Sequence, residues 1–178
     1  LGKPRLGFLI NSGNVDSMVN NFSVSKNRRK RDQYSPGAKA GRRPDRAVIV
    51  YSNLARQAYR DVPVIIGGLE ASLRRLGHYD YWSDRVRRSI LMDSKADILI
   101  YGMGERAVCE IAEALDSGIE ACDIGWSRGT CVKAKSAADV GSLIPEEDDV
   151  VLPAFAELAD KDEAKAKEAY NRSFALQY

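Results

Sequence analysis

Three short apolar runs, each followed by small and polar residues, form the clearest pattern along the chain. The runs span residues 5–10, 64–66 and 97–101, and their β-branched and aliphatic residues are typical of buried strands. Each run leads into a turn rich in Gly, Ser or Asn, and a stretch compatible with a helix follows each turn. Strand, turn and helix repeated in this way predict an α/β domain with a mostly parallel sheet flanked by helices.

The turns after these runs are the first candidates for ligand binding. In an open parallel sheet the carboxyl ends of the strands meet at one edge, where helix N-termini leave a crevice that binds ligands. The run Gly102-Met-Gly-Glu105 lacks the third glycine of the dinucleotide fingerprint, which disfavours a free-standing nucleotide-binding domain. We expect ligand contacts from residues in all of these turns: Ser12, Gly13, Asn14, Gly67, Gly68, Glu70, Gly102, Gly104 and Glu105.

Two helices are predicted on either side of a long polar loop. Residues 15–22 favour a short helix with Asn14 as its cap, and Asp45 is the candidate N-cap of a helix over residues 47–59. A strand at the start of this second segment would leave only about eight residues for the crossover to the next strand, too few for the usual parallel connection. The helix is therefore the favoured interpretation.

The second half of the chain predicts three further elements. Residues 83–93 favour a helix, because their apolar positions recur at helical spacing. Residues 122–126 and 130–134, joined by Ser-Arg-Gly, predict a β-hairpin at the antiparallel margin of the sheet. Residues 160–177 predict a charged helix.

Composition excludes several classes of protein. Of the 178 residues 44% are hydrophobic and 29% are charged, as in a globular domain, and no apolar run is long enough to span a membrane. No signal-peptide pattern is present, so we expect a cytoplasmic protein. Three widely spaced cysteines and the single histidine, His78, offer neither a metal-ligand set nor a catalytic triad. No catalytic or metal-binding residue is therefore assigned.

Charge is distributed unevenly, although the net charge is only +2. Nine Lys or Arg stand against two Asp from Val24 to Arg46, and nine acids stand against three lysines from Glu146 to Glu168. One interpretation is a solvated loop and a surface helix. The alternative is a nucleic-acid-binding module, in which the basic segment 26–46 binds phosphates and Tyr79, Tyr81 and Trp82 stack on bases.

A cluster of aromatic residues follows the helix that begins at Gly67 and Gly68. Two tyrosines, a tryptophan and an arginine close together predict a surface that contacts another part of the protein. Ordinary, partly buried aromatics of a globular domain are the alternative. The candidate interface residues are Tyr79, Tyr81, Trp82 and Arg85.

Six segments together resemble one family, the YgiQ-type radical SAM proteins, which are uncharacterised bacterial iron–sulfur proteins. The resemblance runs in matching order through residues 14–20, 34–37, 43–51, 67–75, 78–82 and 86–90. It implies a Rossmann-like, cobalamin-binding-like N-terminal domain, followed in full-length members by a radical SAM barrel. That barrel holds a [4Fe-4S] cluster through Cys-x3-Cys-x2-Cys and cleaves S-adenosylmethionine. The motif is missing here, so no cluster ligand carries over to this chain.

The resemblance also implies a division into domains and bears on the expected cofactors. It implies a cobalamin-binding-like domain over residues 1–145, with its first strand missing, and an acidic linker and helix over 146–178 leading to a barrel outside this chain. Related cobalamin domains supply a histidine from Asp-x-His-x-x-Gly. His78 lies in His-Tyr-Asp-Tyr-Trp instead, which counts against cobalamin. The expected function is an accessory domain that positions or covers an unknown substrate for that barrel.

Overall fold

The computed structural model describes residues 2–134 and 150–177. The chain falls into two compact units. The first unit comprises Leu1–Arg75 and Ile90–Lys133, and the second comprises Leu76–Ser89 and Ala134–Tyr178. The sheet and the helices that cover it belong to the first unit.

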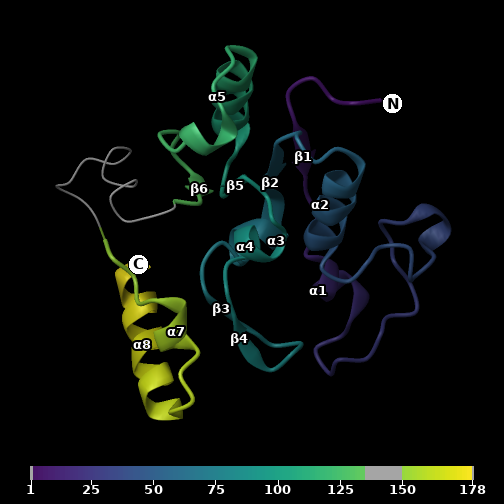
Figure 1. Ribbon diagram of the computed structural model, residues 1–178. Helices are drawn as coiled ribbons and strands as arrows, with labels where there is room; N and C mark the ends of the chain where they lie inside the picture. Colours follow the sequence, from purple (N-terminus) through teal and green to yellow (C-terminus); the bar gives the residue numbers. More distant parts are fainter. Residues whose placement is uncertain (1, 135–149, 178) are drawn as a thin grey trace. The chain divides into compact units, whose positions relative to one another are not determined.

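A four-stranded, mostly parallel sheet forms the centre of the first unit, as predicted. Its strand order is β1-β2-β5-β6 (Figure 1). The first three strands are parallel, with Phe8 opposite Val64 and Ile65 opposite Ile98, and β6 is antiparallel to β5. The strands are β1 (Phe8–Ile10), β2 (Val64–Ile66), β5 (Ile98–Ile100) and β6 (Thr130–Val132).

Helices cover both faces of this sheet. Because successive strand residues point to opposite faces, Ile66 and Leu99 pack in one core, whereas Ile65 and Ile98 pack in another. The first core also takes side chains from α2 (Ala47–Ala58), α3 (Gly68–Leu73) and α4 (Ile90–Asp93). The second takes its helical side chains from α5 (Glu105–Asp116). The predicted α/β class is confirmed.

The first two helices confirm the sequence prediction, but their caps differ from it. Helix α1 (Ser17–Asn21) is capped by Asp16, not Asn14, because the Asp16 carboxylate accepts the backbone N–H groups of Met18 and Val19 at 2.9 and 3.2 Å. Helix α2 follows Arg46, which has a left-handed backbone with φ of 53° and no capping side chain. Asp45 does not cap it.

The helix predicted over residues 83–93 is wrong. Strands β3 (His78–Asp80) and β4 (Arg85–Arg87) form an antiparallel pair, and only Ile90–Asp93 is helical. The buried Asp80 carboxylate accepts the backbone N–H and the hydroxyl of Ser83, which closes the turn between the strands. The polar–apolar alternation of Arg85-Val86-Arg87 suits a strand as well as a helix, so periodicity alone did not decide.

The hairpin predicted over residues 122–134 is only half correct. Thr130–Val132 is a strand at the antiparallel margin, as expected, but its partner is β5. Ala121–Asp123 forms a 3-10 turn instead of the first hairpin strand. The neighbouring Ile124 is fully buried in the core beneath α5, and that burial fixes the segment in place of strand pairing.

The second unit holds the β3–β4 hairpin and the helices α7 (Phe155–Leu158) and α8 (Glu163–Gln177). Helix α8 confirms the charged helix predicted over 160–177. Leu158 is buried against Gly77, where an added Cβ would lie 2.7 Å from the Leu158 Cδ1 atom. The expected domain boundary at residue 145 and the first part of the predicted acidic linker lie outside the described residues.

The chain leaves the first unit after Arg75 and returns to it at Ile90. The backbone N–H of Ile90 donates to the carbonyl of Arg74 at 2.9 Å, so the two ends of the segment between them are held together. The β3–β4 hairpin is thus inserted between α3 and α4.

Across the described parts of the chain, no helix combines the length and the apolar character needed to cross a membrane.

Candidate functional site

A cleft of about 450 Å³ lies at the carboxyl edge of the parallel strands, where the sequence places ligand binding. Residues at the ends of β1, β2 and β5 and the start of α5 line it, and we call it the strand-end cleft. Its lining is Leu9, Ile10, Asn11, Ile65, Ile66, Gly67, Gly68, Ile100, Gly102, Gly104, Glu105 and Val108.

Two glycines shape this cleft through the close approach of neighbouring atoms. Gly68 has φ of 78°, and an added Cβ would lie 3.1 Å from the Asn11 Cβ atom. At Gly104 an added Cβ would lie 2.8 Å from the Ile100 Cγ2 atom. Larger residues at these positions would displace the strand ends that form the cleft.

The cleft offers little charge to a ligand. The Asn11 side-chain oxygen accepts the N–H of Gly13 at 2.8 Å, while its amide nitrogen has no acceptor among the described residues. Glu105 is exposed in the first turn of α5. A negative charge in the first turn of a helix competes with an anionic ligand for the positive end of the helix dipole. An apolar floor, one amide and one carboxylate suit an uncharged or apolar group better than a phosphate.

Five of the predicted ligand residues line the strand-end cleft, and four lie elsewhere. Ser12 is buried and its hydroxyl donates to the carbonyl of Val15 at 3.1 Å, while Gly13 and Asn14 do not line the cleft. The prediction missed Asn11, although it directly follows a strand, which is the signal that selected its neighbours. The five lining residues are Gly67, Gly68, Gly102, Gly104 and Glu105.

Glu70, the remaining residue predicted to contact a ligand, links three helices through hydrogen bonds. Its side chain is 1% exposed. One carboxylate oxygen accepts the N–H of Ser17 at 2.9 Å and the other accepts the N–H of Val48 at 3.1 Å. Glu70 on α3 therefore satisfies donors at the N-terminal ends of α1 and α2, and both of its oxygens are occupied inside the scaffold.

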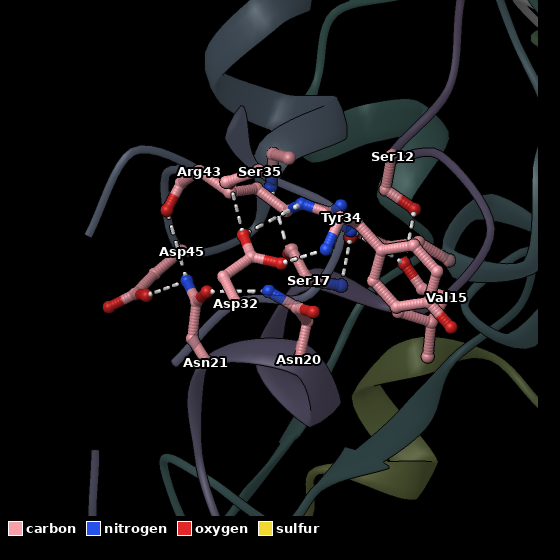
Figure 2. A network of polar contacts seen from close by, with 12 residues as sticks. Ser12, Val15, Ser17, Asn20, Asn21, Asp32, Tyr34, Ser35, Arg43 and Asp45 are labelled. Carbon is pink, nitrogen blue, oxygen red and sulfur yellow. Dashed lines mark hydrogen bonds and ion pairs between the residues drawn. The ribbon is translucent and has the colours of Figure 1, made fainter. Parts of the chain in front are cut away.

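The basic segment is organised around a buried carboxylate, Asp32 (Figure 2). Asp32 accepts the Ser35 hydroxyl at 2.6 Å and the Tyr34 N–H at 3.0 Å, and the Arg43 guanidinium lies 3.9 Å away. These contacts, the Ser35 hydroxyl above all, hold the pKa of Asp32 below its ordinary value of 3.8.

A second set of polar contacts fastens the same segment to α1. The Asn21 amide donates to the Asp45 carboxylate at 2.7 Å and to the Arg43 carbonyl at 3.1 Å (Figure 2). The other Asp45 oxygen pairs with Arg28 at 2.9 Å. Both acids of segment 26–46 are thus paired with cations of the same segment.

A cleft of about 560 Å³ lies between this segment and α1. We call it the basic cleft, because its lining includes three consecutive cationic residues and no acidic one. The lining is Val15, Val19, Asn20, Arg29, Lys30, Arg31, Gln33 and Tyr34.

The predicted interface residues lie on the β3–β4 hairpin of the second unit. Tyr79 and Tyr81 are 49% and 44% exposed, and the Tyr81 and Trp82 rings meet edge to face at 5.3 Å. The Tyr79 hydroxyl donates to the Asp84 carboxylate, which raises the pKa of Tyr79. Arg85 is exposed. The two parts of the alternative nucleic-acid surface therefore belong to different units.

The family described as Radical SAM N-terminal matches residues 1–178. The chain belongs to this family. A UPF0313 protein of Clostridium perfringens (strain SM101 / Type A) is 49% identical over all of this chain and 25% of its own length. A UPF0313 protein of Clostridium botulinum (strain Kyoto / Type A2) is 50% identical over all of this chain and 26% of its own length. The chain thus spans about a quarter of these relatives, and no solved structure matches it.

Radical SAM proteins as a class use an iron–sulfur cluster and S-adenosylmethionine, and the described residues of this chain do not fit such a cluster. Cys109 and Cys122 are exposed and Cys131 is half-buried. Partial desolvation and the nearby Asp123 and Glu120 carboxylates raise the pKa of the Cys122 thiol, and burial raises the pKa of the Cys131 thiol, whereas cluster ligands are thiolates. Within residues 2–134 and 150–177 no three His, Cys, Asp or Glu side chains converge as metal ligands.

Proposed function

We propose that this chain is an accessory domain of a radical SAM iron–sulfur enzyme, in which it positions or covers the substrate of a barrel outside the chain. The observation that carries the proposal is the strand-end cleft. It lies at the edge where open α/β sheets bind ligands, in a chain of the Radical SAM N-terminal family. The barrel would supply the [4Fe-4S] cluster and S-adenosylmethionine, and this chain would supply a largely apolar binding surface.

Exposed apolar side chains around the cleft support a contact with another part of the protein. Leu9 lines the cleft and is 60% exposed. Leu69 follows Gly68, while Tyr101 and Met103 flank Gly102, and all three are exposed. Apolar side chains gathered on one edge mark interaction sites more often than single exposed ones do.

The proposal is tested by filling the cleft in the full-length protein. Leu9→Trp adds bulk at an exposed position that lines the cleft. We expect the rate of 5′-deoxyadenosine formation from S-adenosylmethionine, with dithionite as reductant, to change by about threefold or more, because altered closure over an active site alters access to it. Iron content and absorbance near 400 nm should stay unchanged, since the variant residue holds no cluster.

The matched control is Leu54→Trp, which introduces the same side chain on α2 at a position that is 55% exposed and outside the cleft lining. Its rate should equal that of the unaltered protein. Equal rates for both variants and the unaltered protein would overturn the proposal.

A further inference from the structure

We infer that the basic cleft binds the phosphate backbone of a single-stranded nucleic acid. This inference goes beyond the proposed function, because it concerns a different surface of the first unit and a different class of ligand. It also narrows the nucleic-acid alternative drawn from the sequence, because the first unit alone supplies both the cations and an aromatic ring.

The charges of the basic cleft are not neutralised within the segment. Asp32 is buried beside Arg43, and Asp45 pairs with Arg28, so neither acid forms an ion pair with the three cations that line the cleft. The Lys30 and Arg31 side chains are exposed and have no partner among the described residues. An anion entering the cleft would meet uncompensated positive charge.

One of these cations is held in a fixed position. The Arg29 Nε–H donates to the carbonyls of Val19 and Phe22 at 3.3 and 3.1 Å, near the end of α1. Its two terminal nitrogens have no acceptor in the described part of the chain. A guanidinium fixed through Nε, with its end open, matches the fork geometry that binds a phosphate.

The loop backbone that carries these cations is also fixed. Isolated β-bridges join Phe22 to Arg28 and Arg31 to Lys39, on either side of the cationic run. The buried Asp32 follows that run directly and ties it to Tyr34 and Ser35. The cleft is therefore formed before a ligand arrives, which lowers the entropy cost of binding.

The arrangement favours an unpaired strand over a single anion or a duplex. Arg29, Lys30 and Arg31 follow one another along the backbone, as a row of charges that tracks successive phosphates would. Tyr34 lines the same cleft and is 56% exposed. A basic groove beside an exposed aromatic ring is the usual design for single strands, because unpaired bases stack on the ring.

The inference is tested with a fluorescent 12-nucleotide oligouridylate, by anisotropy across a salt series. Three phosphate contacts predict a log–log slope of about −2 for the unaltered chain. Lys30→Gln with Arg31→Gln should weaken binding by about tenfold at low salt. It should also make the slope less negative by about 1.4, because two phosphate contacts are lost. Tyr34→Leu should weaken binding at every salt concentration without changing the slope, since it removes stacking and no charge.

The matched control removes the same charge elsewhere. Lys161→Gln with Lys167→Gln alters exposed lysines of the second unit, and its binding curve should coincide with that of the unaltered chain. Circular dichroism should be the same for all variants. Absence of binding at about 50 mM salt, equal weakening by the control pair, or full displacement of the oligonucleotide by equimolar inorganic phosphate would each overturn the inference.

Discussion

The strand-end cleft and the basic cleft lie in the same unit, but backbone groups hold the first in shape and side-chain groups hold the second. Backbone ladders between β1, β2 and β5 fix the strand-end cleft, and glycines keep it open. Side-chain hydrogen bonds to Asp32, Asn21 and Asp45 fix the basic cleft. A sheet edge is a consequence of local pattern, whereas an ordered loop depends on a few polar contacts that single substitutions remove.

The largest effect should come from Glu70→Ala, because Glu70 joins the helix at the strand-end cleft to the helix beside the basic cleft. The change leaves the buried N–H groups of Ser17 and Val48 without their acceptor. We expect a loss of about 3 kcal/mol in the free energy of unfolding, measured by urea denaturation.

Glu105→Ala is the matched control, since Glu105 is exposed and no described residue bonds to its side chain. Its unfolding free energy should stay within about 0.5 kcal/mol of the unaltered chain. Equal losses for the two variants would show that the Glu70 carboxylate does not hold the helices.

A smaller loss in the free energy of unfolding should follow Gly104→Ala, which alters the strand-end cleft and not the basic cleft. The new Cβ would approach the Ile100 Cγ2 atom to 2.8 Å, so we expect about 2 kcal/mol of destabilisation in thermal or urea unfolding. Gly67→Ala should cost far less, because its backbone is extended and the nearest atom lies at 3.4 Å. A Gly67→Ala loss as large as that of Gly104→Ala would contradict the close approach seen at Ile100.

The smallest effect on the free energy of unfolding should follow Asp32→Asn, which alters the basic cleft alone. Losing the charged acceptor of the Ser35 hydroxyl and the Tyr34 N–H should speed hydrogen exchange at the Tyr34 amide about fivefold, while global unfolding changes little.

The same amide should report the titration of Asp32. The pKa of the Asp32 carboxyl in the folded chain lies below 3.8. The contribution of the ionised carboxylate to the stability of the loop is therefore complete above pH 3.8 and is lost as the pH falls through the lower pKa of the folded state. Exchange at Tyr34, corrected for the intrinsic rate, should therefore speed up only below pH 3.8 in the unaltered chain and show no such step in Asp32→Asn. A step in both proteins would assign the transition to another group.

The sheet and most of the strand-end cleft were predictable because their signals are local. An apolar run followed by Gly67 and Gly68, or by Gly102 and Gly104, specifies both a strand and the turn that ends it. Asn11 follows the same rule and was overlooked. The role of Glu70 could not be found this way, since its hydrogen-bond partners lie 53 and 22 positions away along the chain.

The hairpin and the basic cleft show where periodicity fails. Arg85-Val86-Arg87 fits a strand or a helix equally, and the turn that decides between them depends on a buried Asp80. Segment 26–46 has no apolar period at all, so its composition predicts a solvated loop. Only long-range bonds from Asn21 and Arg43 reveal that it encloses a cleft.

The hydrogen bond between Ile90 and Arg74 has a consequence for how proteins with this sheet can diversify. Because the two ends of the hairpin segment are already joined at its base, exchanging residues 76–89 for a shorter or longer stretch would change the loop-closure entropy only slightly. The sheet and its two clefts need not be rebuilt when that segment changes. The position between α3 and α4 is therefore a natural insertion point, at which a new recognition surface can be exchanged without redesigning the first unit.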